Sequence, residues 1–287
     1  MAKPKRTLAE QLHARRLRKP PALIYRTLGY LWRLLYFKKL GVQVETKNDP
    51  RACKGPYIVV SNHASRLDYI YTGAVLLPDT LSFVAGYNEF FRSHLAFIFR
   101  LLQVIPKKNF TPDIYTIKEI ARILRKGGRV MLFPEGMSSI GGGNQPCAIG
   151  SGKLLKHFGV PVYFSKISGG YLTSTKYCLD ERPGKVNVVI DRLFSPEQLK
   201  GMSAEEIQLA LDVAIQNDDY EWNRSAKIVY DGKGRIAHQM HTRLYRCPRC
   251  GAEFQMRGEE DTIRCLACGN GARVNADYSL SPLDETW

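Results

Sequence analysis

The 287-residue chain has no long apolar segment and no sign of a secreted, disulfide-linked protein. No uninterrupted apolar run reaches the ~18 residues of a transmembrane helix. The basic N-terminus is followed by no small-residue cleavage site, and Arg26 and Arg33 interrupt its apolar stretch. Four of the seven cysteines form two closely spaced pairs, and the other three (Cys53, Cys147 and Cys178) are scattered along the chain. We therefore expect an unprocessed, cytosol-facing protein without a spanning helix.

Acidic residues are also scarce, and the resulting positive charge is concentrated at one end. The chain has 27 Asp and Glu against 42 Lys and Arg, a formal charge of +15. Residues 1–40 contain eleven of the basic side chains and a single acid, Glu10. This distribution predicts a polyanionic partner for the N-terminus, either a nucleic acid or an anionic membrane surface.

Residues 22–40 favour the membrane. Arg26 and Arg33 are seven residues apart and fall on one stripe of a helix, whereas most of the remaining surface is apolar or aromatic. Such a helix is too charged to span a bilayer, and it is typical of an interfacial helix with Trp32 and the tyrosines at headgroup level. The alternative is a helix that packs on its own domain. We predict a basic arm and interfacial helix over residues 1–41.

From residue 42 the sequence alternates between strand and helix patterns. Buried strands are predicted at 57–61, 81–85, 129–133, 160–165 and 186–190, and helices at 66–77, 88–104, 111–126, 153–158 and 203–216. Thr111 and Pro112 are predicted to begin the third helix, and Ser203 with Glu206 forms a capping box. This order predicts an α/β fold with a mixed, largely parallel sheet flanked by helices over 42–216. A linker over 217–243 and a cysteine-containing module over 244–287 follow.

Three motifs follow or precede these strands. Asn62-His63-Ala64-Ser65-Arg66-Leu67-Asp68 comes after the first strand, and a carboxylate can orient a histidine as a base. By itself this spacing is weak, since a histidine that bonds its own loop is common. Phe133-Pro134-Glu135-Gly136 ends the third strand, where open α/β sheets place ligands. Gly159-Val160-Pro161-Val162 leads into the next strand.

With these three motifs in this order, the chain resembles the glycerolipid acyltransferases, which include the 1-acylglycerol-3-phosphate acyltransferases. The resemblance covers about residues 22–195. It implies that His63 is the general base for the acceptor hydroxyl and that Asp68 orients it. It also implies that Pro134, Glu135 and Gly136 bind the acceptor, and that acyl-CoA or acyl-carrier protein is the donor. Because the acceptor is itself the nucleophile, no acyl-enzyme is expected.

Two positions depart from the family pattern. Ser138 and Asn109 stand where the family commonly has arginines that are associated with the acceptor phosphate, and neither side chain can grip phosphate as a guanidinium does. Lys107 and Lys108 are either substitute phosphate ligands or solvated surface lysines. Lysophosphatidate is the default acceptor, and another lysolipid or a phosphate-free glycolipid is the alternative.

Ser61, Ser65 and Cys147 have side chains that could in principle act as nucleophiles. Ser61 and Ser65 lie next to His63, but no second histidine is paired with them, which favours loop hydroxyls that bond the backbone. Cys147 has no basic neighbour, which favours an inert thiol.

The remaining four cysteines form a metal-binding pattern. Cys247-Pro-Arg-Cys250-Gly and Cys265-Leu-Ala-Cys268-Gly are separated by fourteen residues. Two such knuckles predict a closed Cys₄ zinc ribbon with structural Zn²⁺ and no open position for catalysis. A redox dithiol pair is the minor alternative.

Together these features predict a peripheral, monotopic acyltransferase on the cytoplasmic face of the cell membrane. Its predicted partners are an anionic membrane surface, a lysolipid acceptor and an acyl thioester donor. A zinc-ribbon protein that binds nucleic acid is the alternative from a different class. It is disfavoured because no aromatic and basic residues interleave as base stacking requires.

Overall fold

A seven-stranded mixed sheet forms the centre of the computed structural model, which describes residues 7–108, 111 and 113–283. Its strands are, in chain order, β1 (Val42–Thr46), β2 (Ile58–Ser61), β3 (Leu81–Gly86), β4 (Ile105–Lys107), β5 (Arg129–Leu132), β6 (Val162–Ser168) and β7 (Val186–Phe194). The order across the sheet is β1-β7-β6-β2-β5-β3-β4, and only the β6–β7 pair is antiparallel. The predicted largely parallel α/β sheet is confirmed.

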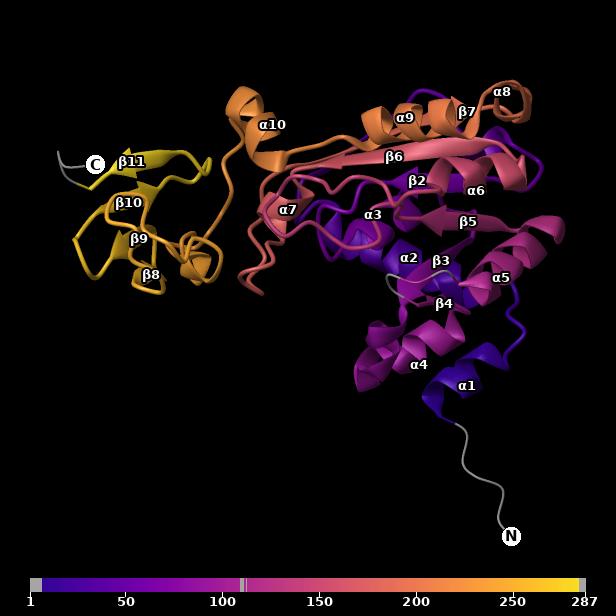
Figure 1. Cartoon of the computed structure of the whole chain (residues 1–287), viewed down its shortest axis with the longest axis horizontal. Coiled ribbons are helices and arrows are strands. Elements are labelled where there is room, and N and C mark those ends of the chain that lie inside the picture. The colour runs from indigo at the N-terminus through magenta and orange to yellow at the C-terminus, as the bar shows by residue number, and fades with distance from the viewer. Residues whose placement is uncertain (1–6, 109–110, 112, 284–287) are drawn as a thin grey trace, which may run out of the picture.

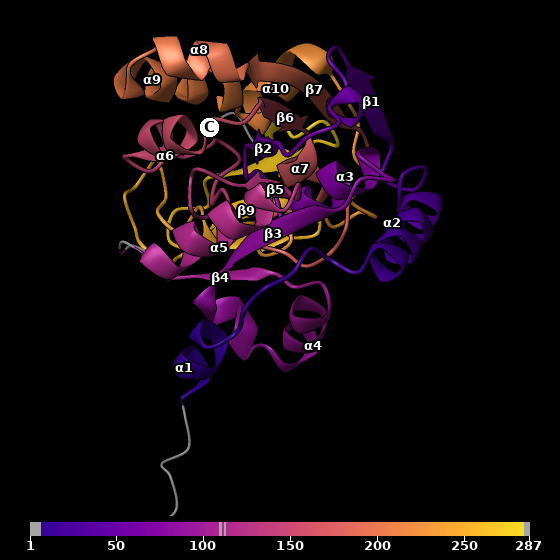
Figure 2. The same cartoon turned by 90° about the vertical axis from the view of Figure 1, so that its right-hand side faces the viewer.

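Helices cover both faces of this sheet (Figures 1 and 2). They are, in chain order, α1 (Leu8–His13), α2 (Ala22–Tyr36), α3 (Asp68–Val75), α4 (Ser93–Leu101), α5 (Ile114–Arg125), α6 (Ser151–Phe158), α7 (Gly170–Thr173), α8 (Pro196–Gly201), α9 (Ala204–Ile215) and α10 (Asp219–Ala226). Short 3₁₀ turns are η1 (Pro50–Ala52), η2 (Tyr87–Phe91) and η3 (Met240–Thr242).

The two faces of β2 belong to different hydrophobic cores, because successive side chains of a strand point in opposite directions. Ile58 and Val60 lie in the core that contains residues of α5, α6 and α9. Tyr57 and Val59 lie in the opposite core, with residues of α2 and α3. The continuous apolar strand that the sequence predicts is therefore buried on both faces, as parallel strands usually are.

Two predicted helix boundaries differ from the structure. Asp113, rather than Thr111, caps α5, because its carboxylate accepts the N–H groups of Thr116 at 3.2 Å and Lys108 at 2.8 Å. Pro112 lies outside the described residues. The predicted helix over 88–104 is divided into η2 and α4 because the backbone is extended at Arg92, with φ −78° and ψ 110°. The capping box of Ser203 and Glu206 is present as predicted.

The described part of the basic arm packs on the α/β domain. Leu12 and Leu17 are buried, and the N–H of Leu17 donates to Oε2 of Glu119 on α5 at 3.1 Å. The ring of His13 contacts the rings of Tyr87 and Tyr115. This arm is thus seated on its own domain by apolar and aromatic contacts.

Helix α2 combines a packed face with an exposed leucine face. Tyr25 is buried and stacks on Phe83, and Trp32 packs against Tyr71 at a centroid distance of 5.5 Å. These two aromatic side chains therefore serve the core rather than the predicted headgroup level. The opposite side exposes Leu23, Leu28, Leu31, Leu34 and Leu35. None of the helices in the described ranges is long and apolar enough to cross a bilayer.

The C-terminal module is a four-stranded antiparallel sheet at the opposite end of the molecule from α8 (Figure 1). Its strands are β8 (Met256–Glu259), β9 (Thr262–Cys265), β10 (Gly271–Val274) and β11 (Leu280–Pro282). The segment that precedes it, predicted as a linker over 217–243, begins with α10. This helix is fixed to the α/β domain because buried Asp219 accepts the N–H groups of Gly169 at 2.9 Å and Tyr171 at 2.7 Å.

Candidate active site and metal centre

His63 and Asp68 form a hydrogen-bonded pair at the carboxyl end of β2. The Nδ1 atom of His63 lies 3.0 Å from Oδ2 of Asp68, whose side chain is fully buried. The imidazole is partly exposed, with 22% of its side-chain surface accessible. A carboxylate that accepts the Nδ1 proton leaves Nε2 as the proton acceptor, which is the arrangement of an oriented general base.

Ser65 lies in the loop before α3 and positions Asp68, the first residue of that helix. Its N–H donates to Oδ2 of Asp68 at 2.7 Å, and its hydroxyl donates to Oδ1 at 2.7 Å. Because Ser65 is itself fully buried, its hydroxyl is a structural donor and not a nucleophile, in line with the loop-hydroxyl interpretation. This contact is not a helix cap, because the N-cap of α3 is Leu67 and has no side-chain capping bond, so a capping pattern could not have identified the role from the sequence.

Glu135 joins the two motifs. Its Oε1 accepts the N–H of His63 at 2.6 Å, and its Oε2 accepts the N–H of Gln145 at 2.8 Å. Strands β2 and β5 are adjacent and parallel, so the residues that follow them meet at one edge of the sheet. Burial raises the pKa of Glu135 to about 6, and the two backbone donors oppose that increase. The carboxylate thus holds together the loop of His63 and the loop over residues 133–150 that follows β5.

The loop after β5 packs directly against His63. The Phe133 ring stacks on the imidazole at a centroid distance of 4.1 Å. The N–H of Ser139 donates to the carbonyl of His63 at 2.6 Å, and Pro134 accepts the N–H of Ala148 at 2.8 Å. Gly136 is exposed beside them. Ser139 and Gln145 are site residues that the motifs did not predict, since their contacts are made by backbone groups.

The predicted lysines lie farther away. Lys107 ends β4, which is separated from β2 by β5 and β3. Three strand spacings amount to about 14 Å, so these lysines reach only a distant part of a substrate bound at His63. Lys108 is exposed. Asn109 lies outside the described residues, and Ser138 is half-buried in the loop after Glu135.

Cys147 is not an activated thiol. It is buried beside Asp212, and burial together with this carboxylate raises the pKa of the thiol. A thiol whose pKa is raised is protonated at neutral pH and is a poor nucleophile. This environment agrees with the inert thiol that the sequence favours.

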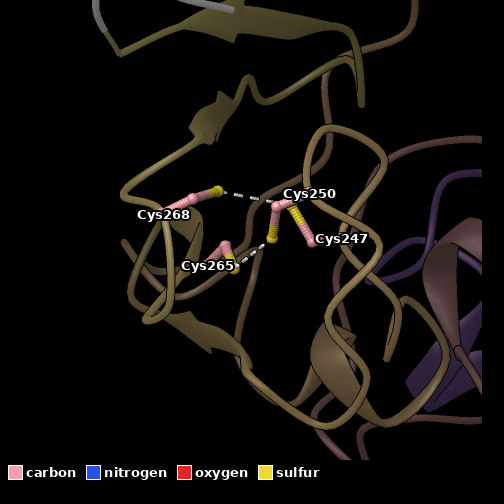
Figure 3. Close-up of side chains that lie close together, drawn as sticks. All are labelled: Cys247, Cys250, Cys265 and Cys268. Atoms are coloured by element: carbon pink, nitrogen blue, oxygen red, sulfur yellow. Dashed lines mark hydrogen bonds between the residues drawn. The ribbon is translucent and has the colours of Figure 1, made fainter.

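The four clustered cysteines converge on one point, as Figure 3 shows. Their sulfur atoms lie within 4.8 Å of one another. The Sγ atoms of Cys247 and Cys268 are 3.7 Å apart, and those of Cys250 and Cys265 are 3.8 Å apart. Sulfurs at ~2.3 Å from a tetrahedral ion are separated by about 3.8 Å. The group therefore has the size of a Cys₄ metal site, and its sulfurs are too far apart for disulfides.

Each pair of cysteines is held by a tight turn. Gly251 and Gly269 have φ angles of 72° and 77°, a region that favours glycine. The N–H of Gly251 donates to the carbonyl of Cys247 at 3.0 Å, and that of Gly269 to Cys265 at 2.9 Å. The glycine after each Cys-x-x-Cys pair is thus required by the turn, as the sequence predicted.

A buried carboxylate connects the active site to α10. Asp219 is fully buried, and burial raises its pKa to about 7. It accepts the N–H groups on either side of Gly170, and a Cβ atom at Gly170 would lie 3.4 Å from Oδ1 of Asp68. No local motif marks Asp219, because its backbone partners Gly169 and Tyr171 are about 50 residues away in the sequence.

Comparisons with known proteins agree with this geometry. Residues 41–165 match the family model described as Acyltransferase. The chain is 31% identical over 109 residues to a chloroplastic 1-acyl-sn-glycerol-3-phosphate acyltransferase of Brassica napus, a match that covers 37% of this chain. It spans about a third of the length of that curated relative, with 31% covered.

A solved structure shares the fold. The crystal structure of the 1-acyl-sn-glycerophosphate (LPA) acyltransferase PlsC from Thermotoga maritima aligns with a TM-score of 0.55 and 22% sequence identity. The alignment covers 68% of this chain and 76% of that chain. The α/β sheet with flanking helices is therefore shared with this structure.

Proposed function

We propose that this chain, whose residues 41–165 match the Acyltransferase family model, is a glycerolipid acyltransferase that transfers a fatty acyl group from a thioester donor to the hydroxyl of a lysolipid. The observation that carries the proposal is the 3.0 Å contact of His63 Nδ1 with buried Asp68 at the edge of the sheet. In this pair the His63 imidazole is an oriented base that is partly exposed to a substrate. Acyl transfer to a hydroxyl requires such a base.

The reaction needs one proton acceptor and no covalent enzyme intermediate. His63 Nε2 takes the proton of the acceptor hydroxyl while the oxygen attacks the thioester carbonyl. The new C–O bond forms, the C–S bond breaks, and the proton passes from His63 to the departing thiolate. Asp68 stabilises the imidazolium that forms between these steps.

Lysophosphatidate is the acceptor that we propose by default, which would make the product phosphatidate. The support is the name of the Brassica relative, a 1-acyl-sn-glycerol-3-phosphate acyltransferase. A phosphate-free lysolipid or a glycolipid is the competing acceptor, because Ser138 replaces an arginine in the loop that contacts His63. Ser138 can donate one hydrogen bond to a phosphate but supplies no charge.

We further propose that the protein binds the cytoplasmic surface of the cell membrane through α2. The support is the row of exposed leucines along α2, with Leu23 80% and Leu34 77% exposed. Basic side chains lie nearby in the sequence, including Arg16, Arg18 and Lys19, which are exposed on the arm. Apolar side chains that enter the interface and cations that attract anionic lipid act together in peripheral binding.

Zn²⁺ is the metal that we propose for the four cysteines. Thiolate sulfurs at tetrahedral spacing suit a closed structural zinc site. Bound there, the ion would hold the two knuckles together and supply folding energy to a module too small for an independent core. Acyl transfer at His63 would not use it.

A panel of acceptors tests the enzymatic proposal. Purified full-length protein is assayed with acyl-CoA and acyl-carrier protein as donors, and with lysophosphatidate, other lysophospholipids and a phosphate-free glycolipid as acceptors. We expect turnover with a lysolipid that falls by about 10²–10⁴-fold in His63→Ala. His157→Ala is the matched control because His157 is exposed on α6. Undiminished activity of His63→Ala, or no turnover with any pair, contradicts the proposal.

A further inference from the structure

Residues 169–182, which we call the bridging segment, connect the surroundings of His63 to the cysteine module. The segment contains α7 and the loop that follows it, and Figure 1 shows this loop between the sheet and the module. Most of its residues are buried. It makes contacts on both sides, so a change in the position of the module can reach the active site through it.

On the active-site side, the bridging segment supports Asp68. A Cβ atom at Gly170 would lie 3.4 Å from Oδ1 of Asp68, so this glycine packs directly against the carboxylate. Arg66, which lies between His63 and Asp68 in the sequence, donates from Nη2 to Oγ of Ser174 at 2.9 Å. The segment thus limits where Asp68 can lie, and Asp68 in turn orients the His63 imidazole.

On the other side, the cysteine module contacts the bridging segment through Tyr278. The hydroxyl of Tyr278 donates to the carbonyl of Leu172 in α7 at 2.7 Å and accepts from Nη1 of Arg182 at 3.4 Å. The ring is buried and packs edge-on against the rings of Tyr220 and Tyr230. One core side chain of the module therefore holds both α7 and the end of the bridging segment.

Arg182 makes the contact with Tyr278 costly to lose. Arg182 is 1% exposed, and its Nη1 lies 3.0 Å from Oγ1 of Thr175 and 3.3 Å from the hydroxyl of Tyr177. Within the described residues it has no carboxylate partner, and its Nε and Nη2 atoms have no hydrogen-bond partner. The hydroxyls around Nη1 and the Tyr177 ring, 5.1 Å from the guanidinium, therefore stabilise this buried cation.

The position of Tyr278 depends in turn on the four cysteines. Tyr278 lies in the turn between β10 and β11, and β10 pairs with β9, which ends at Cys265. Cys247 and Cys265 are buried in the same hydrophobic core as Tyr278, and this core also contains Ala64, the residue after His63. A metal that holds the two knuckles together would therefore also hold Tyr278 in place.

We propose that Tyr278 is a positioning residue for acyl transfer, and that the metal-folded cysteine module is thereby a structural part of the active site. The inference rests on the proposed acyl transfer and adds a residue outside the range 41–165, which matches the family model. Because Tyr278 is buried, it acts only through the bridging segment that supports Asp68. Loss of its hydroxyl, or of the metal, should lower kcat and leave the KM for the acceptor unchanged.

Tyr278→Phe removes the hydroxyl and keeps the ring in the core. We expect kcat to fall about 3- to 10-fold, the effect of one neutral hydrogen bond. The pH dependence of kcat should shift, because a less firmly held Asp68 changes the basicity of His63, and the zinc content should stay that of wild type. Tyr245→Phe is the matched control, since Tyr245 is an exposed tyrosine of the same module that stacks on Phe254.

Two results with Tyr278→Phe overturn the proposal. One is a kcat and a pH profile equal to those of wild type. The other is a loss of activity that only follows the fraction of unfolded protein, with an unshifted profile, because a merely structural role predicts this outcome.

Hydrogen–deuterium exchange tests the coupling without turnover. Zinc is removed from the purified whole chain with a chelator, and exchange is compared over residues 61–75, 169–182 and 204–215. We expect faster exchange in the first two ranges and no change in the third, because α9 packs in a different core. The metal-free protein should lose about 10²-fold in kcat, as a displacement of about 1 Å can cause, and should recover when zinc is returned.

The two measurements separate this inference from the proposed function. Unchanged exchange over residues 169–182 together with an unchanged kcat in the metal-free protein overturns the role of Tyr278 and leaves the acyltransferase intact. Absence of turnover in wild type with every donor and acceptor instead defeats the proposed function.

Discussion

The backbone N–H of His63 donates to Oε1 of Glu135 at 2.6 Å, which ties the base of one motif to the carboxylate of the other. The second oxygen of Glu135 is occupied by the N–H of Gln145. The resemblance to the family implies that Glu135 binds the acceptor, and that role stays a prediction. The observed contacts add a positioning role, since they determine where the His63 loop lies.

Glu135→Gln separates these two roles. The amide can accept only one of the two N–H bonds, and its NH₂ group meets the other donor. A hydrogen bond to a charged group contributes about 1.5–3 kcal/mol, so we expect kcat to fall about 10- to 100-fold. The KM for the acceptor should change much less. Steady-state kinetics over a range of acceptor concentrations gives both constants, and a rise in KM alone would show that Glu135 acts through acceptor binding.

The stability of the fold should depend on pH through the same carboxylate. Burial raises the pKa of Glu135 from 4.5 to about 6, so between these values the folded protein binds more protons than the unfolded chain. The contribution of this group is therefore fully present below pH 4.5 and is lost as the pH rises through 6. This difference in pKa corresponds to about 2 kcal/mol in the free energy of unfolding.

Urea unfolding of wild type and Glu135→Gln between about pH 4 and pH 7 measures this effect. We expect the stability of wild type to decrease relative to the variant as the pH rises, because the variant lacks the titrating group. Parallel pH profiles for the two proteins would contradict the raised pKa.

Ser65 should affect catalysis only through Asp68. Ser65→Ala removes the 2.7 Å bond to Oδ1 of Asp68, and we expect kcat to fall about 10-fold. Asp68→Asn, which removes the charge that supports His63, should lower kcat by about 10²–10⁴-fold. The pH dependence of kcat should shift in Ser65→Ala, since a less firmly held carboxylate changes the basicity of His63. A loss of folded protein with an unshifted profile would point to a structural role alone.

The exposed leucines of α2 should control membrane binding. Burial of one leucine side chain contributes about 1.5–3 kcal/mol when complete. Leu31→Glu with Leu34→Glu should therefore weaken binding to anionic vesicles at least about 10-fold, as measured by liposome flotation. Leu209→Glu is the matched control, because Leu209 is 67% exposed on α9. Equal loss of binding in the control, or no loss in the α2 variant, would exclude α2 as the anchor.

Metal removal should affect the C-terminal module before the catalytic sheet. Cys265→Ser removes one of four converging sulfurs, and structural zinc supplies folding energy to such modules. We expect one equivalent of zinc in wild type and its loss in the variant, with faster proteolysis within 244–283. Cys53→Ser is the control, since Cys53 lies outside the cluster. Full zinc content in Cys265→Ser would contradict the proposed site.

Much of the α/β domain was predictable from local pattern. Strand β2 and the helix after it follow from a buried apolar run and a Pro-terminated helical segment, and both are observed. Strands β1 and β4 were not predicted. They are the two edge strands of the sheet. β4 has only three residues and β1 is largely exposed, so neither shows a strong hydrophobic period. The motif residues His63 and Asp68 were identified because only four residues separate them, with His63 in the loop after β2 and Asp68 as the first residue of α3.

The sequence by itself determined which residues have the chemistry: a histidine and a carboxylate five positions apart, and two cysteine knuckles whose glycines admit the turn. Only the tertiary structure decided what surrounds them. Adjacent parallel strands bring Glu135 to the backbone of His63, and buried Asp219 draws α10 against the active-site wall. The spacing of residues along a chain predicts contacts only between residues that are a few positions apart. Contacts between residues that are 50 to 100 positions apart depend on strand order and core packing, which no local pattern contains.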